Sequence, residues 1–124
     1  MFYLVAFALG ACIYVLIEIF WRGRSHWTMA VAGGLCLLLL CGPYRQLTST
    51  PLIFSCIFGG LLITSIEYIV GFIVNLKLGW GVWDYSSVKY NYQGQICLRY
   101  SIIWIFLCAP AYFLLDFVYT SFFS

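Results

Sequence analysis

Two acidic side chains stand inside long apolar runs of this sequence. Glu18 lies in the run at residues 2–21, and Glu67 lies in the run at residues 52–76. Taking a carboxylate out of water is costly unless the group is protonated, paired or turned toward water. Acids in such positions typically bind a cation or relay protons. Glu67 and Glu18 are therefore candidates for an ion or proton site.

A second concentration of polar groups follows the third apolar run, in GWGVWDYSSVKYNYQGQICLRYS at residues 79–101. It is rich in aromatic and uncharged hydrogen-bonding side chains, whereas a simple cytoplasmic loop would more often use Lys, Glu, Ser and Pro. Irregular backbone at membrane depth survives only where protein or a water-filled cavity satisfies it. We expect residues 79–95, the polar segment, to pack as a lid over Glu67 and Glu18. Polar groups that could complete the site are Asp84, Tyr85, Asn91 and Arg99.

The overall composition is that of a membrane protein. Apolar residues make up 65% of the 124 residues and charged residues 8%, against about 25% charged in ordinary soluble domains. A soluble domain of this size buries only about two-thirds of its surface, too little to hide so many apolar side chains from water. We therefore expect a single integral membrane domain, 1–124, surrounded by the lipid bilayer.

The chain divides into four apolar runs, at about 2–21, 27–42, 52–76 and 96–118. A helix needs about 20 residues to cross a bilayer. The second run has 16 residues and would rely on Trp27 and Tyr44 as interfacial anchors, or on local thinning of the bilayer. The predicted fold class is an all-α membrane protein: a bundle of four transmembrane helices with an interfacial or re-entrant segment between helices 3 and 4.

The cationic side chains indicate how these helices are oriented. Arg45 lies on one side, and the loops after the first and third runs carry the other five of the six, namely Arg22, Arg24, Lys77, Lys89 and Arg99. By the positive-inside rule, both termini lie outside and the polar segment lies in the cytoplasm. No basic residue precedes the first run, which favours a retained helix over a cleaved signal peptide.

Small and polar residues of the third run share one helix face. Gly60, Thr64, Glu67, Gly71 and Asn75 recur at spacings of four, three, four and four, which places them within about a third of the helix circumference. Small residues let helices approach closely, and polar residues seek partners across the contact. The pattern indicates either a helix–helix packing seam or a seam that also lines a site.

A buried ion pair is the alternative to a functional site around Glu67. Glu67 and Glu18 are both expected on the cytoplasmic side of the bilayer midplane, near the depth of Arg22, Arg24 and Arg99. Paired charges are the commonest fate of acids inside a membrane. The sequence leaves both interpretations open.

Other kinds of site have little support. The only histidine, His26, lies in a short loop and is more typical of an interfacial residue than of a catalytic one. The sequence has no metal-ligand cluster, no Ser/His/Asp set and no G-x-x-x-x-G-K-[ST] loop, and its net charge is only +2. We therefore expect no metal, cofactor, nucleotide or nucleic acid. A disulfide between Cys41 and Cys56, near the outer ends of neighbouring helices, stays open.

One part of the chain resembles a known family. In order, it contains Thr64-Ser65-Ile66-Glu67-Tyr68-Ile69-Val70-Gly71, Trp83-Asp84-Tyr85-Ser86, Asn91, Gly94-Gln95-Ile96-Cys97-Leu98 and Trp104. These residues resemble the E-Y-I-x-G, W-D-Y-S and N-x-x-G-x-I-C-L motifs of the bacterial putative ABC-transporter permeases of CmpB type. The likeness is strong at about 65–104 and rests on hydropathy alone in the first two helices. It departs from the family near Asn75, where an acidic residue often occurs.

The resemblance implies a multi-pass, permease-like protein of the bacterial inner (plasma) membrane. Motif residues expected to be structural are Trp83, Ser86, Gly71, Gly94 and Gln95. Four helices are few for a whole permease, so a transport role would require a homo-oligomer or other membrane subunits.

Three functions fit these observations. The first is a transport or channel component whose site lies at the cytoplasmic end of the bundle and comprises Glu67, Glu18, Asp84, Tyr85, Asn91 and Arg99. The second is a structural or regulatory subunit of a larger membrane complex, in which the polar segment locks the fold. The third is a membrane enzyme acting on a lipid, with Asp84, Glu67 and Tyr85 as acid–base groups. The shortage of other catalytic side chains disfavours the enzyme.

Overall fold

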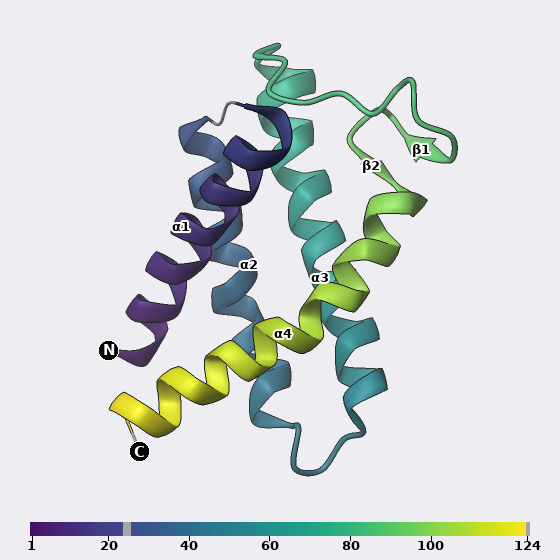
Figure 1. Cartoon of the computed structure of the whole chain (residues 1–124). Helices are drawn as coiled ribbons and strands as arrows, with labels where there is room; N and C mark the ends of the chain where they lie inside the picture. Colours follow the sequence, from purple (N-terminus) through teal and green to yellow (C-terminus); the bar gives the residue numbers. More distant parts are fainter. Residues whose placement is uncertain (24–25, 124) are drawn as a thin grey trace.

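The computed structural model describes residues 1–23 and 26–123, with residue 22 described by its backbone alone. In chain order the elements are α1 (Phe2–Arg22), α2 (Trp27–Arg45), α3 (Leu52–Gly71), the π-helix η1 (Phe72–Lys77), β1 (Asn91–Tyr92), β2 (Ile96–Cys97) and α4 (Leu98–Phe122) (Figure 1). Within this part of the chain, four helical spans are long and apolar enough to cross a membrane. The predicted class, an all-α membrane protein with four spanning helices, is confirmed.

α2 is longer than the apolar run from which it was predicted. It has 19 residues and continues past Gly42 to Arg45. Pro43 lies in the last turn, where its missing N–H removes one backbone hydrogen bond without ending the helix. At 1.5 Å per residue the helix is about 28 Å long, close to the hydrocarbon thickness. α2 is therefore long enough to cross without the bilayer thinning that a shorter helix would need.

α4 begins later than the predicted fourth span. Ile96 and Cys97 form strand β2 instead, which pairs antiparallel with β1. A tight turn joins the two strands, with Gln93 at φ 54° and Gly94 at φ 73°. α4 then runs to Phe122, beyond the predicted end at residue 118. The short hairpin thus replaces the first turn that hydropathy assigned to the helix.

α1 and α2 pack backbone against backbone. A Cβ atom added at Gly10 would lie 2.5 Å from the carbonyl oxygen of Gly33, and one added at Gly33 would overlap Tyr14. A Cβ atom at Gly34 would lie 2.8 Å from the ring of Phe7. Gly10 and Gly33 are required because any larger residue would push the two backbones apart, whereas at Gly34 the Phe7 side chain could move.

The small and polar face of the third helix lies against α4 and the polar segment. Gly60 packs on Ile105, where an added Cβ atom would overlap the side chain. Thr64 Oγ1 donates to Ser101 Oγ at 3.0 Å. This confirms the predicted packing seam. Its other three members, described below, are Glu67, Gly71 and Asn75.

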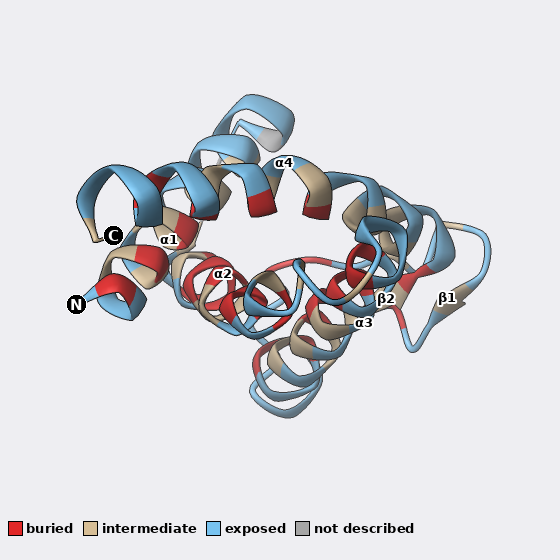
Figure 2. Ribbon diagram, turned by 90° about the horizontal axis from the view of Figure 1, so that it is seen from below, coloured by how far each residue is buried: buried red, intermediate tan, exposed pale blue. Residues whose placement is uncertain are grey.

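α4 lies against α3 near the hairpin and then crosses toward the beginning of α1 (Figure 1). At that end the ring of Phe2 lies 5.3 Å from Tyr119 and 5.6 Å from Phe123, so both termini lie at the same end of the bundle. Tyr112 and Leu115 of α4 are almost fully buried, and Figure 2 shows buried positions on the facing sides of α2, α3 and α4.

The six cysteines all lie within the described residues, and all are free thiols. Cys41 and Cys56 are both buried, and Cys41 Sγ donates to the carbonyl of Leu37 at 3.6 Å. The disulfide considered for this pair is not formed.

Candidate functional site

α3 passes into the polar segment through a π-helix and two glycines. The N–H of Leu78 donates to the carbonyl of Ile73 at 3.0 Å, a wider turn than that of an α-helix. Gly79 and Gly81 then adopt φ of 69° and 60°, a region that residues with side chains rarely enter. The third helix therefore ends through backbone geometry, and the chain turns back toward the bundle.

Asn75 joins the third helix to the polar segment through both ends of its amide. Its Nδ2 donates to Gln95 Oε1 at 2.8 Å, and its Oδ1 accepts from the N–H of Val82 at 2.6 Å. A carboxylate at this position could accept from the N–H of Val82 but could not donate to Gln95 Oε1. Asparagine, which has both a donor and an acceptor, therefore suits this position.

Trp83 and Gln95 dock the polar segment on α3. Trp83 Nε1 donates to the backbone carbonyl of Gln95 at 3.0 Å, and the two side chains are 6% and 3% exposed. Both pack on Gly71, where a Cβ atom would lie 2.6 Å from Gln95 Oε1 and 2.9 Å from the Trp83 ring. The absence of a side chain at Gly71 is thus what allows the close approach.

Local hydrogen bonds shape the polar segment around Tyr85. Asp84 Oδ1 accepts from the N–H of Ser86 at 2.9 Å, and Asn91 Oδ1 accepts from the N–H of Gly94 at 3.0 Å. The N–H of Tyr85 donates to the carbonyl of Gly94 at 2.7 Å. Asp and Asn commonly make such turn-forming bonds to nearby backbone. These bonds fix the position from which the Tyr85 side chain reaches the helices.

Glu67 is the buried acid at the centre of this region. Its side chain is 6% exposed. Tyr85 Oη donates to Glu67 Oε2 at 2.9 Å, and Trp104 Nε1 donates to Glu67 Oε1 at 3.4 Å. Two neutral donors, one from the polar segment and one from α4, therefore take the place of water around this carboxyl group.

The Tyr85 phenol is held as a hydrogen-bond donor. Burial raises its pKa far above the usual range, and the negative charge of Glu67 raises the pKa further. Its ring stacks on Tyr100 with centroids 5.0 Å apart. The phenol therefore keeps its proton at neutral pH and can donate it in the bond to Glu67.

The ion pair considered for Glu67 is not found among the described residues. Arg99 is exposed, and its guanidinium lies 5.9 Å from the centroid of the Tyr100 ring. Arg24 and the side chain of Arg22 lie outside the described residues. Within the described part of the chain, the acid is satisfied by neutral groups.

Two adjoining cavities lie beside Glu67 and Glu18. A small cavity of about 10 Å³ touches Glu67 and is also lined by Tyr14, Trp83 and Trp104. The same three aromatic residues line a cavity of about 690 Å³, whose polar lining also includes Glu18, Asp84 and Tyr85. The structure therefore brings four of the six candidates around one region. Asn91 instead shapes the loop, and Arg99 lies on the surface.

Sequence reasoning missed two aromatic residues of this region. Trp104 bonds to Glu67, and Tyr14 lies with its ring 5.8 Å from that of Trp104. A signal for Tyr14 existed, because Gly10, Tyr14 and Glu18 recur at spacings of four and share a face of α1. Trp104 is one of the residues that carry the family resemblance, but its hydrogen bond to Glu67 could not be predicted, since this partner depends on how α4 crosses α3.

His26 has a structural role that the sequence did not specify. Its Nδ1 accepts from the N–H of Thr28 at 3.2 Å and caps the beginning of α2. Its ring lies 5.7 Å from Trp27 and 5.9 Å from Trp80, so the cap is also part of an aromatic cluster. This agrees with an interfacial position rather than a catalytic one.

Comparison with known families places the whole chain in one of them. The family model described as "Putative ABC-transporter type IV" matches residues 2–124. The match includes the first two helices, where the resemblance had rested on hydropathy alone. No curated protein and no solved structure matches the chain significantly. The chain, a multi-pass membrane protein, therefore belongs to the putative ABC-transporter type IV family.

Proposed function

We propose that this chain is a transport or channel component, a single membrane domain that carries an acid-containing site at the cytoplasmic end of its bundle. The observation that carries the proposal is the Glu67 carboxyl group, buried between two neutral donors and next to a small cavity that adjoins the larger one lined by Glu18 and Asp84. Family membership agrees with a transport role. Because four helices are few for a permease, we propose that the chain works as a homo-oligomer or with other membrane subunits.

The orientation is part of the proposal. Among the cations that the structure describes, Arg45 lies at one end of the bundle. At the other end, where the polar segment lies, are Arg22, Lys77, Lys89 and Arg99. The positive-inside rule then sets the polar segment in the cytoplasm and both termini outside the inner membrane.

The chemistry follows from the surroundings of Glu67. A carboxyl group that neutral donors hold in place can gain or release a proton, or meet a cation, without breaking an ion pair. Tyr85 keeps its own proton, so it orients the acid while its own charge stays unchanged. Glu18 and Asp84 line the larger cavity, and ionised carboxylates there would attract cations.

Flux through proteoliposomes tests the site. We expect the purified chain to carry protons or monovalent cations down a potassium diffusion potential, read with an entrapped pH dye or ion indicator. Glu67→Gln keeps the shape of the side chain and removes its titration, so most of the flux should be lost.

Asp116→Asn is the matched control. This exposed acid accepts a hydrogen bond from Tyr44 at 3.0 Å at the other end of the bundle, so its replacement should leave the flux unchanged. Equal flux in wild type and Glu67→Gln would contradict the proposal, and no flux above that of protein-free liposomes would exclude a homo-oligomer that transports by itself.

The second candidate is a structural or regulatory subunit of a larger complex. It is favoured by the bonds of Asn75, Gln95 and Trp83, which fasten the polar segment to α3. On this hypothesis a larger partner copurifies in fixed stoichiometry, and Glu67→Gln lowers the melting temperature without changing any flux.

A further inference from the structure

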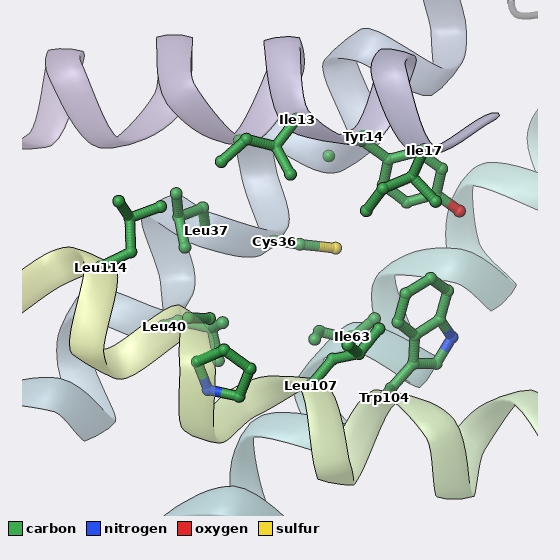
Figure 3. Close-up of a pocket in the computed structure, with 14 residues that line it drawn as sticks. Ile13, Tyr14, Ile17, Cys36, Leu37, Leu40, Ile63, Trp104, Leu107 and Leu114 are labelled. Atoms are coloured by element: carbon green, nitrogen blue, oxygen red, sulfur yellow. The ribbon is translucent and has the colours of Figure 1, made fainter. Parts of the chain in front are cut away.

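α1 and α4 diverge to leave an apolar cavity between them. It has a volume of about 310 Å³ and is lined by Ile13, Ile17, Leu107 and Leu114 among others (Figure 3). Figure 3 shows side chains of α1 and α4 facing each other across it. Ile13, Ile17 and Leu107 are also 37%, 44% and 40% exposed, so the cavity opens sideways toward the lipid.

This apolar cavity adjoins the larger cavity near the polar segment. Four residues line both, namely Tyr14, Ile17, Trp104 and Leu107. The first cavity is walled almost entirely by apolar side chains, and the second also carries Glu18 and Asp84. We call the pair of cavities the α1–α4 crevice. Each has a volume within the range of about 300–1,000 Å³ that is typical of ligand pockets.

The polar end of the crevice combines negative charge with aromatic walls. The charged side chains that the structure describes in its lining, Glu18 and Asp84, are both acidic. Its aromatic lining residues are Tyr14, Trp21, Trp83, Tyr85, Tyr100 and Trp104. Aromatic faces attract cations, and aromatic cages recognise quaternary ammonium groups.

We propose that the α1–α4 crevice binds an amphiphile with a cationic head, its alkyl chain in the apolar cavity and its ammonium group between the acidic and aromatic side chains of the polar end. This inference rests on the proposed function, because it names the substrate class of the same site. The head would lie beside Tyr14 and Trp104, which also line the small cavity at Glu67.

A second transmembrane helix fits the crevice less well. Such a helix is about 10 Å wide and needs a groove along the full depth of the bundle. At the end that holds both termini, α1 and α4 are in contact through Phe2, Tyr119 and Phe123, which closes the crevice. A flexible alkyl chain requires no such continuous groove.

Equilibrium binding tests the inference on the full chain in phosphatidylcholine nanodiscs. The probe is radiolabelled dodecyltrimethylammonium below its micellar concentration, with empty nanodiscs as the background. We expect saturable binding, at least about tenfold tighter than that of dodecyl sulfate, which has the same chain and an anionic head.

Paired variants locate the ligand. Leu107→Trp fills the apolar cavity and should weaken binding by about tenfold or more, whereas Phe106→Trp, on the 74% exposed neighbour, should not. Glu18→Gln should weaken binding of the cation and leave dodecyl sulfate unchanged. If Leu107→Trp fails to fold, Ile17→Trp fills the same apolar cavity from the α1 side.

Three results would overturn the inference. They are binding that does not saturate, equal binding of the two head groups, and equal affinity in Leu107→Trp and Phe106→Trp. If the chain forms a dimer that Leu107→Trp dissociates, and the cation does not bind saturably, then the crevice is the surface that contacts a second copy of the chain. Glu67-dependent flux without saturable binding would overturn only this inference, and saturable binding without flux would overturn only the proposed function.

Discussion

The two helix pairs of this bundle are held together by different chemistry. α1 and α2 meet where Gly10 and Gly33 bring the backbones into contact. α3 and α4 meet along polar groups, with Thr64 bonded to Ser101 and Glu67 to Trp104. Lipid tails are as apolar as leucine, so in a bilayer close packing holds helices together while hydrogen bonds select particular atoms. The α1–α2 pair is therefore held by close backbone packing, whereas the α3–α4 pair also positions the Glu67 carboxyl group.

Breaking the glycine contact should have the largest effect. Gly33→Ala puts a Cβ atom against Tyr14 and 2.7 Å from the carbonyl oxygen of Gly10, which cannot move without the helix. We expect the free energy of unfolding to fall by about 3 kcal/mol, measured by steric trapping in bicelles. Gly42→Ala is the control, because no atom lies within 4 Å of its added Cβ. Equal losses in the two variants would show that the close contact is unimportant.

Breaking the polar docking should have the next largest effect. Gln95→Leu removes the acceptor of Asn75 Nδ2 at a position that is 3% exposed and leaves that donor unpaired. We expect a loss of about 2 kcal/mol in the free energy of unfolding, by the same method. Gln46→Leu, on an exposed residue at the end of α2, should change it little. If Gln95→Leu left the free energy of unfolding unchanged, the polar segment would dock without this hydrogen bond.

Tyr85→Phe tests a single hydrogen bond between the polar segment and α3. Glu67 loses one donor, so we expect a loss of about 1 kcal/mol at neutral pH, against no change for the exposed Tyr90→Phe. Burial raises the pKa of Tyr85, so the folded chain keeps a proton that the unfolded chain releases above about pH 10. The stabilisation is complete below about pH 10 and is lost as the pH rises further.

The stability gap between wild type and Tyr85→Phe should therefore shrink above about pH 10. Thermal unfolding in detergent at a series of pH values measures it. A gap that stayed constant into the alkaline range would show that the Tyr85 proton is not held by the fold.

Thr64→Val should have the smallest effect. It removes a partly exposed interhelical hydrogen bond to Ser101 and keeps the shape of the side chain. Such bonds contribute about 0.6 kcal/mol in membrane proteins, so a small fall in the free energy of unfolding is expected. Ser65→Ala is the comparison, because Ser65 bonds only within its own helix, to Leu61. A loss as large as that of Gln95→Leu would show that the α3–α4 contact outweighs the docking of the polar segment.

The class of the protein, and the residues that share the small and polar face of α3, could be predicted from the sequence alone. Hydropathy and helix length are properties of contiguous residues, so they predict spans whatever the helices contact. The spacing of Gly60, Thr64 and Glu67 likewise sets one helix face by periodicity alone. Asp84 could be placed in a turn for the same reason, since its partner is two residues away.

Which side chains form hydrogen bonds with one another, by contrast, became evident from the tertiary structure. Glu67 is bonded to Tyr85 and Trp104, 18 and 37 residues away, and the sequence could not choose between these donors and an arginine. The crevice arises because α4 crosses α3 at an angle, so that α1 and α4 meet near Phe2 and again where the rings of Tyr14 and Trp104 lie 5.8 Å apart. Periodicity gives the direction of a side chain about its own helix. The crossing of two helices depends on the packing of both surfaces at once.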